Sequence, residues 1–250
     1  MTVTDPKHYE AASDELRERA ILVTGAGDGI GRAVALALAA HGATVILSGR
    51  TVSKLEATHD QILAASGPQP SIAPLNLERA LANDFDALAA AIESNYGRLD
   101  GLLHNAAILG QLSPIDHYDV PTWVRVMHVN VTAGFALTQV CLPLLRKSPD
   151  ASVLFTSSSV GRQGRALWGA YSVSKFAVEG LAQVLADELT STTIRVNCIN
   201  PVRARTLMRL QAYPAEDRST LPDPGALVGP YLYLLGPASR GISGQSFDCF

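Results

Sequence analysis

The chain alternates short runs of apolar and β-branched residues with longer stretches whose apolar residues recur at helical spacing. The short runs predict strands at 20–25, 43–49, 71–77, 99–107, 151–159, 193–201 and near 244–250. The longer stretches predict helices at 31–42, 53–67, 84–97, 169–189 and 225–236. Between 115 and 147 we expect a long helical region, interrupted near Pro121 and Pro143. A looser segment rich in Pro and Arg is expected over 202–224.

This alternation of strand and helix predicts one α/β domain. Parallel strands need a crossover between them, and the crossover helices cover both faces of the sheet. We therefore expect a single doubly wound, Rossmann-type domain with a mostly parallel, seven-stranded sheet. No repeat, low-complexity segment or linker divides residues 18–250. Residues 1–17 are polar and charged, and they predict an N-terminal extension or an added helix.

Composition and charge narrow the class of protein. At 250 residues with 47% hydrophobic side chains, the chain is long enough to bury a sizeable core. The net charge of −3 is small and Lys and Arg form no block, which argues against nucleic acid and anionic membrane as partners. The N-terminus lacks the apolar region of a signal peptide, and the longest apolar run, 33–40, is too short to cross a bilayer.

Cysteine and histidine usage adds two expectations. The three cysteines, Cys141, Cys198 and Cys249, are far apart and form no CxxC pair, which is typical of reduced thiols in a cytoplasmic protein. The six histidines show no metal-ligand spacing, so we expect no metal site.

The turn between the first strand and the first helix reads LVTGAGDGIGRA. Its glycines do not fit the spacing G-x-G-x-x-G, but they fit G-x-x-x-G-x-G through Gly25, Gly29 and Gly31. Glycine permits positive φ and lets the backbone approach a pyrophosphate, which the N-terminus of the helix then binds. A purely structural loop is the alternative, but the position after the first strand favours a dinucleotide site.

The end of the second strand bears on which dinucleotide binds. NAD-preferring sites usually carry a carboxylate there, whereas this chain reads SGRT over 48–51. Arg50 could pair with a 2′-phosphate, which favours NADP over NAD. Two alternatives weigh against this: Arg50 as a solvated loop residue, and Asp28 pointing its negative charge toward the same phosphate.

Tyr171 and Lys175 stand four apart in GAYSVSK, so on a helix they share one face. One such pair arises easily by chance, but further stretches occur with it. Together they resemble the short-chain dehydrogenase/reductase family, in that family's order. The matching stretches are TGAGDGIG (24–31), HNAA (104–107), Asn130 in HVNV, Ser158 in TSSSVG, YSVSK (171–175) and NPVRART (200–206). The resemblance covers 18–250, and residues 155–188 look most like the bacterial YciK-like oxidoreductases.

The resemblance implies a role for each matching residue, within one domain that carries both the cofactor and the substrate site. Tyr171 would be the general acid/base, and Lys175 would lower its pKa from near 10 and bind the nicotinamide ribose. Ser158, chosen from three consecutive serines by the pattern Ser-x-x-Gly with Gly161, would orient the substrate oxygen. Asn130 would hold a water linked to Lys175. The expected cofactor contacts are Gly25, Gly29, Ile30, Gly31, Arg50, Asn76, Leu77, Asn105, Ala106, Ala107, Tyr171, Lys175, Pro201 and Thr206.

Some positions depart from the family pattern. Ala107 stands where the family has Gly, and Asn76-Leu77 stands where Asp-Leu usually faces the adenine; we expect the adenine contact to persist. His104 replaces an Asn and is expected to be a packed, hydrogen-bonded residue rather than a catalyst. The ending SFDCF differs from the family's Asp-Gly-Gly.

The largest departure is NPVRART, where Val202 replaces the glycine beside the nicotinamide. Valine is bulky and stiff at χ1, whereas glycine gives room and free φ and ψ. Three outcomes are open: a shifted nicotinamide, a narrower site, or an anionic substrate attracted by Arg203, Arg205 or Arg209. Taken singly, each of these arginines is expected to face solvent in a lid over 203–224.

These observations favour a cytoplasmic, NAD(P)-dependent oxidoreductase that transfers a hydride between the nicotinamide and a carbonyl or alcohol substrate. A dinucleotide-binding sensor or scaffold with little turnover is the alternative, because of the altered Pro201-Val202 turn, and a structural oligomer with a vestigial site is a third. The intact set of catalytic positions favours the enzyme. The resemblance also implies a homodimer or homotetramer, with which the Ala- and Leu-rich patterns of 133–147 and 176–189 are compatible.

Overall fold

Seven strands form one sheet in the order β3-β2-β1-β4-β5-β6-β7, and every neighbouring pair is parallel. The computed structural model describes residues 6–250. Its strands are β1 (Ala20–Thr24), β2 (Thr44–Gly49), β3 (Ser71–Pro74), β4 (Gly101–His104), β5 (Ala151–Thr156), β6 (Ile194–Asn200) and β7 (Ser246–Asp248). The strand order reverses between β1 and β4, which opens a ligand-binding crevice at their carboxyl ends. The predicted single doubly wound domain with seven strands is confirmed.

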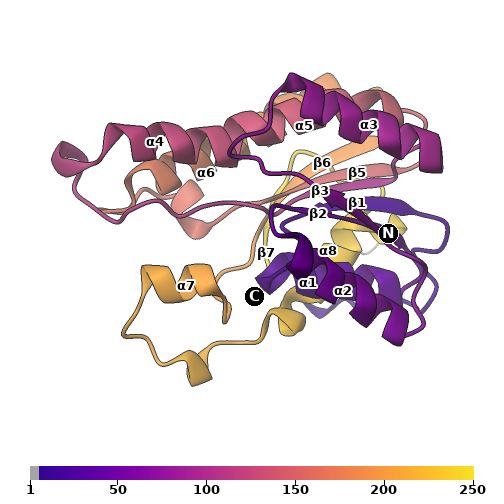
Figure 1. Cartoon of the computed structure of the whole chain (residues 1–250), viewed down its shortest axis with the longest axis horizontal. Helices are drawn as coiled ribbons and strands as arrows, with labels where there is room; N and C mark the ends of the chain where they lie inside the picture. The colour runs from indigo at the N-terminus through magenta and orange to yellow at the C-terminus, as the bar shows by residue number, and fades with distance from the viewer. Residues whose placement is uncertain (1–5) are drawn as a thin grey trace.

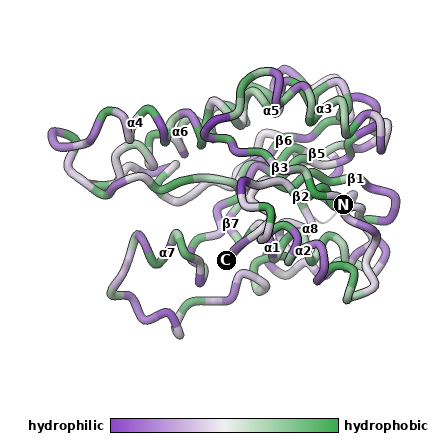
Figure 2. Tube along the Cα trace, in the orientation of Figure 1, coloured by the Kyte–Doolittle hydropathy of each residue, from purple (hydrophilic) through white to green (hydrophobic). Residues whose placement is uncertain are grey.

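Helices cover both faces of the sheet (Figure 1). Alternate residues of β1 enter the two cores: Ile21 and Val23 join one, and Leu22 joins the other. Figure 2 shows the hydrophobic segments gathered around the sheet. The first core is covered by α1 (Gly29–Ala40), α2 (Val52–Ala64) and α8 (Val228–Leu235), and the second by α3 (Ala82–Tyr96), α5 (Ala133–Leu145) and α6 (Gly169–Glu188). The remaining helices are α4 (Val120–Met127), α7 (Leu207–Ala212) and short 3₁₀ turns at Pro6–His8, Ile115–His117, Ser159–Gly161, Arg218–Thr220, Pro224–Leu227 and Pro237–Ser239.

Three strands end three residues earlier than predicted, at Pro74, His104 and Thr156. The apolar pattern continues past these ends because the following turns also pack against the core, as the buried Leu75 does. Strand pairing stops there because the chain turns away from the sheet. These turns carry six of the candidate site residues: Asn76, Leu77, Asn105, Ala106, Ala107 and Ser158.

The long helical region differs from its prediction at one proline. Pro121 lies in the first turn of α4, where a missing N–H costs no helical hydrogen bond. Pro143 does not interrupt α5, which continues to Leu145. The irregularity lies instead in a π-helical turn, His128–Thr132, that joins α4 to α5 and contains Asn130.

The continuous helical run Val120–Leu145, with a mean hydropathy of 1.3, is long and apolar enough to cross a membrane by length and composition. The sequence pattern led us to expect no such stretch. Leu137, Cys141 and Leu144 on this run are buried against the sheet in the second core. The α5 part of the run is therefore a core helix of this domain.

The N-terminal segment packs against the rest of the domain. Leu16 is fully buried in the core that α1 and α8 cover, and Tyr9 meets Tyr233 edge to face with ring centroids 5.1 Å apart. Residues 1–5 of the predicted extension lie outside the described residues. Residues 9–16 therefore contribute to the core on which the site is built.

Candidate active site

The glycine turn leaves no room for side chains where it meets α1. Gly25 and Gly29 have φ of +70° and +52°, in the left-handed region that glycine favours. A Cβ on Gly31 would lie 2.3 Å from the carbonyl oxygen of Gly25. The first-turn N–H groups at Ile30 and Gly31 have no partner within the helix. Such a cradle at a helix N-terminus fits the pyrophosphate of a dinucleotide.

Thr24 and Asn105 hold this turn at the point where β1 and β4 diverge. The Thr24 hydroxyl accepts hydrogen bonds from the backbone N–H groups of Asn105 and Ala106, at 3.0 and 3.1 Å. The Asn105 amide donates to the carbonyl oxygen of Thr24 at 3.3 Å. A Cβ on Gly31 would lie only 2.5 Å from that amide nitrogen. Asn105 therefore fixes the distance between the glycine turn and β4.

The carboxylate of Asp28 is hydrogen-bonded and ion-paired within the protein. It caps α1 by accepting a hydrogen bond of 2.8 Å from the N–H of Gly29, and it pairs with the ammonium group of Lys54. The hydrogen bond from Lys54 is the main reason that the pKa of Asp28 lies below its usual value. A carboxylate neutralised in this way repels a nearby phosphate less than a free one.

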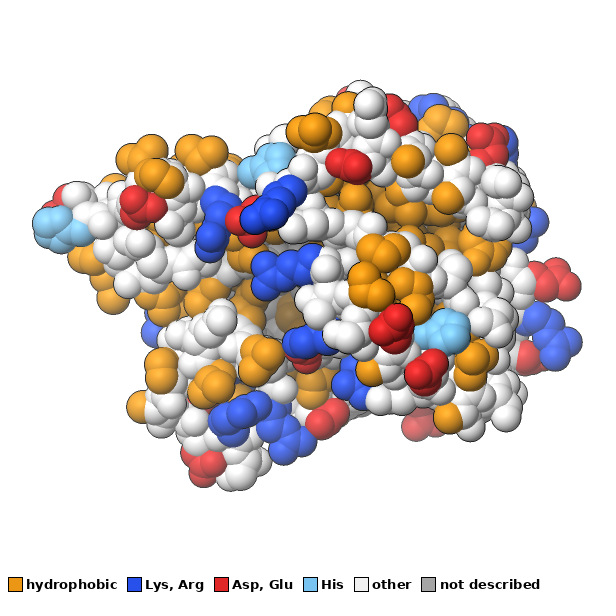
Figure 3. Space-filling view, viewed as in Figure 1, with side chains coloured by type: hydrophobic (Ala, Val, Ile, Leu, Met, Phe, Trp, Pro, Cys, Tyr) orange, Lys and Arg blue, Asp and Glu red, His pale blue; other side chains and the backbone are white. Residues whose placement is uncertain are grey.

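Arg50, just after β2, is exposed and has no hydrogen-bond or ion-pair partner among residues 6–250. Figure 3 shows Lys and Arg side chains gathered around a hollow in the middle of one face of the molecule. Within the described part of the chain, Arg50 therefore offers a positive charge without an acidic partner, just after the carboxyl end of β2.

Tyr171 and Lys175 lie one turn apart on α6 and are 7% and 4% exposed. The Lys175 Nζ lies 5.6 Å from the centroid of the Tyr171 ring and donates a hydrogen bond of 2.6 Å to the carbonyl oxygen of Thr156. Ser158, two residues beyond β5, is half-buried and lies near enough to the Tyr171 side chain to lower its pKa. The fold thus brings together Ser158, Tyr171 and Lys175, of which the first and the last are seventeen positions apart in the sequence.

Burial dominates the ionisation of both groups on α6. It raises the pKa of Tyr171 to about 12, against the opposing hydrogen bond from Ser158. It lowers the pKa of Lys175 to about 8, against the opposing charge of Glu179. The predicted lowering of the Tyr171 pKa by Lys175 does not occur in the protein alone, where burial raises this pKa and the Lys175 Nζ lies 5.6 Å from the ring centroid. At neutral pH Tyr171 is a phenol with a proton to donate.

Asn130 projects from the π-helical turn and ties it to α6. Its amide donates to the carbonyl oxygen of Ile108 and to the hydroxyl of Ser174, each at 3.0 Å, and its Oδ1 accepts from the N–H of Ile108 at 2.8 Å. A cavity of about 10 Å³, bordered by Asn130, Lys175 and Thr156, lies beside it. That volume is close to the space that one water needs.

Gly161 explains the Ser-x-x-Gly pattern in packing terms. A Cβ on Gly161 would lie 2.7 Å from the Cβ of Lys175 and 2.9 Å from its backbone carbonyl carbon. The turn after Ser158 can approach α6 this closely only with glycine there. Of the neighbouring serines, Ser157 is buried and Ser159 is exposed.

Val202 adopts a left-handed backbone with φ of +63°, although it is β-branched and 44% exposed. Its N–H donates a hydrogen bond of 3.0 Å to Oδ1 of Asn200. Further along, Thr206 caps α7 and lies against the glycine turn: a Cβ on Gly29 would be 3.3 Å from the Thr206 methyl group. The segment from Pro201 to Thr206 therefore borders the dinucleotide cradle.

The lid contains a short helix, α7, that its Pro- and Arg-rich sequence did not predict. Arg203 and Arg205 are exposed, and Arg205 pairs with Asp223 at 2.9 Å. Arg209 is half-buried, pairs with Glu216 at 2.6 Å and stacks on the ring of Tyr213 at 3.8 Å. The prediction of a solvent-facing side chain is therefore wrong for Arg209, because Glu216 and Tyr213 hold it within the lid.

An apolar cover over Tyr171 was not predicted from the sequence. Trp168 tilts against Tyr171 with ring centroids 5.7 Å apart, and it also meets Tyr213 of the lid. The side chains that pack with Tyr171 come from four separate segments and are Leu109, Val160, Trp168, Met208 and Ala212. The only sign of this cover in the sequence was Trp168, a large aromatic residue just before α6.

Other predicted positions have structural contacts of their own. His104 is buried, hydrogen-bonds the Thr138 hydroxyl at 2.8 Å and stacks on Phe155, and burial lowers its pKa to about 3. It is therefore a packed, neutral residue, as predicted. Asn76 accepts a hydrogen bond of 3.1 Å from the N–H of Glu78 through Oδ1. Its NH2 group makes no hydrogen bond within residues 6–250 and is free to meet an adenine. Leu77 borders the small cavity beside Lys175, and Ala107 is half-buried.

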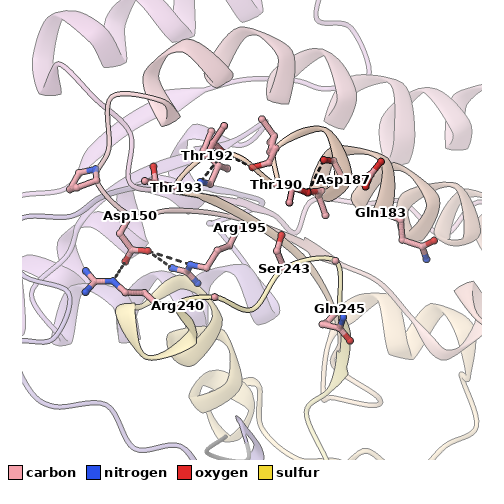
Figure 4. Close-up of a pocket in the computed structure, with 16 residues that line it drawn as sticks. Asp150, Gln183, Asp187, Thr190, Thr192, Thr193, Arg195, Arg240, Ser243 and Gln245 are labelled. Carbon is pink, nitrogen blue, oxygen red and sulfur yellow. Dashed lines mark hydrogen bonds and ion pairs between the residues drawn. The ribbon is translucent and has the colours of Figure 1, made fainter. Parts of the chain in front are cut away.

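The larger cavity, of about 630 Å³, lies at the amino ends of β5 and β6 and contains none of the predicted site residues (Figure 4). Asp150 accepts a hydrogen bond of 3.1 Å from Arg195 and forms an ion pair of 3.4 Å with Arg240. Arg195 also donates to the carbonyl oxygens of Leu234 and Gly236. The buried charges of Asp150 and Arg195 thus have partners inside the protein, and we infer that this network stabilises the fold.

Comparisons with known proteins agree with this geometry. The family model for short chain dehydrogenases matches residues 19–217. The Escherichia coli (strain K12) oxidoreductase YciK is 51% identical over 241 residues, which cover 96% of this chain and 95% of YciK. The structure of a Pseudomonas syringae short chain dehydrogenase is 55% identical with a TM-score of 0.96, covering 97% of this chain and 98% of that one. A Shigella flexneri short chain dehydrogenase, solved with NADP, is 50% identical with a TM-score of 0.93, covering 95% and 99%. The resemblance drawn from the motifs is confirmed: this chain belongs to the short chain dehydrogenase family, as an oxidoreductase that acts on CH–OH and C=O groups with NAD(P).

Proposed function

We propose that this protein is an NADP(H)-dependent oxidoreductase that transfers a hydride to or from a carbonyl/alcohol substrate, with Tyr171 as the general acid/base. The observation that carries the proposal is the convergence of Tyr171, Ser158 and Lys175 beyond the carboxyl end of β5. Ligands of open α/β sheets bind at that edge. The glycine cradle at Gly25–Gly31 lies at the same edge and fits a dinucleotide.

When bound, the nicotinamide supplies or accepts the hydride. In the direction of reduction, the Tyr171 phenol donates its proton to the carbonyl oxygen as negative charge develops there. The Ser158 hydroxyl donates a hydrogen bond to the same oxygen and orients it. The Lys175 ammonium, 5.6 Å from the ring, stabilises the phenolate that results.

Asn130 would maintain the route by which Tyr171 regains a proton. The cavity between Asn130 and Lys175 has a volume of about 10 Å³, which suits one water. Both amide hydrogens of Asn130 are already engaged, so that water would be held by Lys175 and by oxygen atoms lining the cavity. Asn130 then acts by fixing the π-helical turn that borders the cavity.

The preference for NADP(H) rests on Arg50. It is exposed at the end of β2 without an internal partner, and the competing carboxylate of Asp28 is neutralised by Lys54. A relative solved with NADP supports the same choice. The remaining expected contacts (Asn76, Leu77, Asn105, Ala106, Ala107, Pro201 and Thr206) lie on turns at the carboxyl ends of β3, β4 and β6, where the adenine and nicotinamide halves would bind.

The apolar cover of Tyr171 favours substrates with an apolar group next to the reacting carbon. Trp168, Val160 and Met208 would desolvate that group. Because Arg205 and Arg209 are paired inside the lid, they favour an anionic substrate less than free arginines would.

The decisive experiment screens NADPH consumption against aldehydes, ketones, quinones and 3-oxoacyl esters, together with fluorescence titration of NADPH and NADH. Turnover of any carbonyl that depends on Tyr171 supports the proposal. Tight NADPH binding without turnover across all four classes would instead favour a dinucleotide-binding sensor.

We further propose that the protein is a cytoplasmic homodimer or homotetramer that assembles through α5 and α6. These helices expose large apolar side chains: Phe135, Val173, Phe176 and Val184 are 41–56% exposed. Analytical ultracentrifugation separates monomer, dimer and tetramer, and Phe176→Glu should shift the protein toward monomer. The three cysteines are free and buried, which suits a reducing compartment.

A further inference from the structure

A chain of side-chain hydrogen bonds connects the Val202 turn to the last strand. The Val202 N–H donates to Oδ1 of Asn200 at 3.0 Å, and Nδ2 of Asn200 donates to Oδ1 of Asp248 at 2.8 Å. Asn200 is only 4% exposed. Its amide is thus held at both ends, with its oxygen toward Val202 and its nitrogen toward Asp248.

Asp248 is itself fixed by Arg162. The guanidinium group donates to Oδ1 of Asp248 at 2.9 Å and to the Ser246 hydroxyl at 2.7 Å, and it pairs with Glu179 at 3.4 Å. Arg162 follows Ser158 by four residues, and Glu179 stands one helical turn beyond Lys175. The network therefore joins β7 to both elements that present the reacting groups.

The Val202 turn needs such support. A left-handed backbone is costly for a non-glycine residue and more so for a β-branched one, and it persists only where its surroundings fix it. The side-chain acceptor that meets the Val202 N–H is Asn200 Oδ1, and the orientation of that amide depends on Asp248. Because this segment borders the glycine turn at Gly29, a change of its backbone would alter the cofactor cradle.

We propose that Asp248 is a positioning residue of the cofactor site, which acts through Asn200 to hold Val202 in its left-handed conformation. The sequence marked the ending SFDCF and the Val202 substitution separately, and hydrogen bonds through Asn200 connect Asp248 of that ending to Val202. The inference rests on the proposed function, since it assigns the Val202 turn to NADP(H) binding.

The test is a cycle of four proteins: wild type, Asp248→Ala, Val202→Gly and the double variant. NADP⁺ affinity is measured by fluorescence titration, and the urea midpoint is measured without cofactor. We expect Asp248→Ala to weaken NADP⁺ binding about tenfold in the wild-type background. In the Val202→Gly background the loss should fall below about twofold, because glycine adopts positive φ without support.

Two further variants separate positioning from a general loss of structure. Asp248→Asn keeps an oxygen that accepts from Asn200 and Arg162, so its affinity should stay within about threefold of wild type. Glu93→Ala removes an exposed ion pair with Lys147, 2.7 Å long and on another part of the molecule, and should leave affinity unchanged. If Asp248→Ala fails to fold, Asp248→Ser takes its place in both backgrounds.

Equal loss of affinity in the two backgrounds, or no loss in either, would overturn the inference. If wild type binds neither NADP⁺ nor NADPH, the proposed function fails instead. The positioning role is then judged on the urea midpoints, where Asp248→Ala must lower the midpoint less in the Val202→Gly background than in wild type. Equal lowering there refutes it.

Discussion

Lys175 donates a hydrogen bond of 2.6 Å from Nζ to the carbonyl oxygen of Thr156. The bond ties the middle of α6 to the last residue of β5 and holds a cation where only 4% of the residue is exposed. Loss of hydration there disfavours the charged form, which lowers the pKa of Lys175 to about 8 from 10.5.

This shift makes stability depend on pH. Between pH 8 and 10.5 the unfolded chain holds a proton on Lys175 that the folded chain has released. Since the unfolded state then binds more protons, the free energy of unfolding rises with pH, by up to about 1.4 kcal/mol per pH unit. We expect wild type to gain stability relative to Lys175→Met between pH 8 and 9.5, and to show a constant difference between pH 6 and 7. Urea unfolding at fixed ionic strength measures this, with Lys147→Met as the control for loss of an exposed lysine. A difference that stays constant up to pH 9.5 would contradict the buried titration.

Removal of the Tyr171 hydroxyl should separate chemistry from binding. Tyr171→Phe keeps the ring that packs against Trp168 and removes the proton donor. We expect kcat on any accepted carbonyl to fall by about 10²–10⁴, with NADPH affinity within about threefold of wild type. Stopped-flow NADPH oxidation and fluorescence titration measure the two quantities, and Tyr96→Phe at the end of α3 is the control. Retained turnover would refute the assignment of Tyr171.

Arg50 should determine the choice between the two dinucleotides. Arg50→Gln removes a charge-assisted contact to a 2′-phosphate that NADH lacks. We expect NADPH affinity to fall roughly ten- to hundred-fold and NADH affinity to change little. Arg146→Gln, an exposed arginine at the end of α5, is the control. Tighter binding of NADH than of NADPH by wild type would exclude this role for Arg50.

Glycine at position 202 should relieve backbone strain. Val202 has φ of +63°, and the left-handed conformation costs an L-residue about 1–2 kcal/mol, part of which glycine loses again through its greater freedom when unfolded. We expect Val202→Gly to raise the free energy of unfolding by roughly 0.5–1 kcal/mol. The same variant should bind NADPH more tightly if the valine side chain crowds the nicotinamide. Val202→Ala is the comparison, since it trims the side chain but keeps most of the strain. A lower stability for Val202→Gly than for Val202→Ala would show that the turn is not strained.

Because Gly161 lies so close to Lys175, a larger side chain at position 161 should lower both stability and activity. A Cβ there would lie 2.7 Å from the Lys175 Cβ, so Gly161→Ala must displace the helix that carries Tyr171. We expect a loss of about 1–3 kcal/mol in the free energy of unfolding and a lower kcat. Gly164 is the matched control, because a Cβ on it would meet nothing within 4 Å. Similar behaviour of Gly161→Ala and Gly164→Ala would argue against a packed contact at Gly161.

Much of the fold could be read from periodicity because the strands of a parallel sheet are buried on both faces and interrupted by helices. Local patterns could not show where pairing ends, so the predicted strand at 151–159 overran β5 by three residues. Nor could they show the π-helical turn at Asn130, since both of its flanks are ordinary helix. The helix α7 was missed because its Pro- and Arg-rich surroundings are typical of loops.

The sequence by itself determined the family of the chain and predicted its reacting residues and its glycine cradle, because these rest on residue type and on order and spacing along the chain. The tertiary structure decided the ionisation of Tyr171 and Lys175. Burial sets the pKa values of Tyr171 and Lys175, and side chains from four segments of the chain form the apolar cover over Tyr171. The left-handed backbone of Val202 likewise depends on Asn200 and on Asp248, far away in the sequence. Such contacts arise only when the chain has folded, because desolvation and hydrogen-bond geometry depend on distance in space and not on distance along the chain.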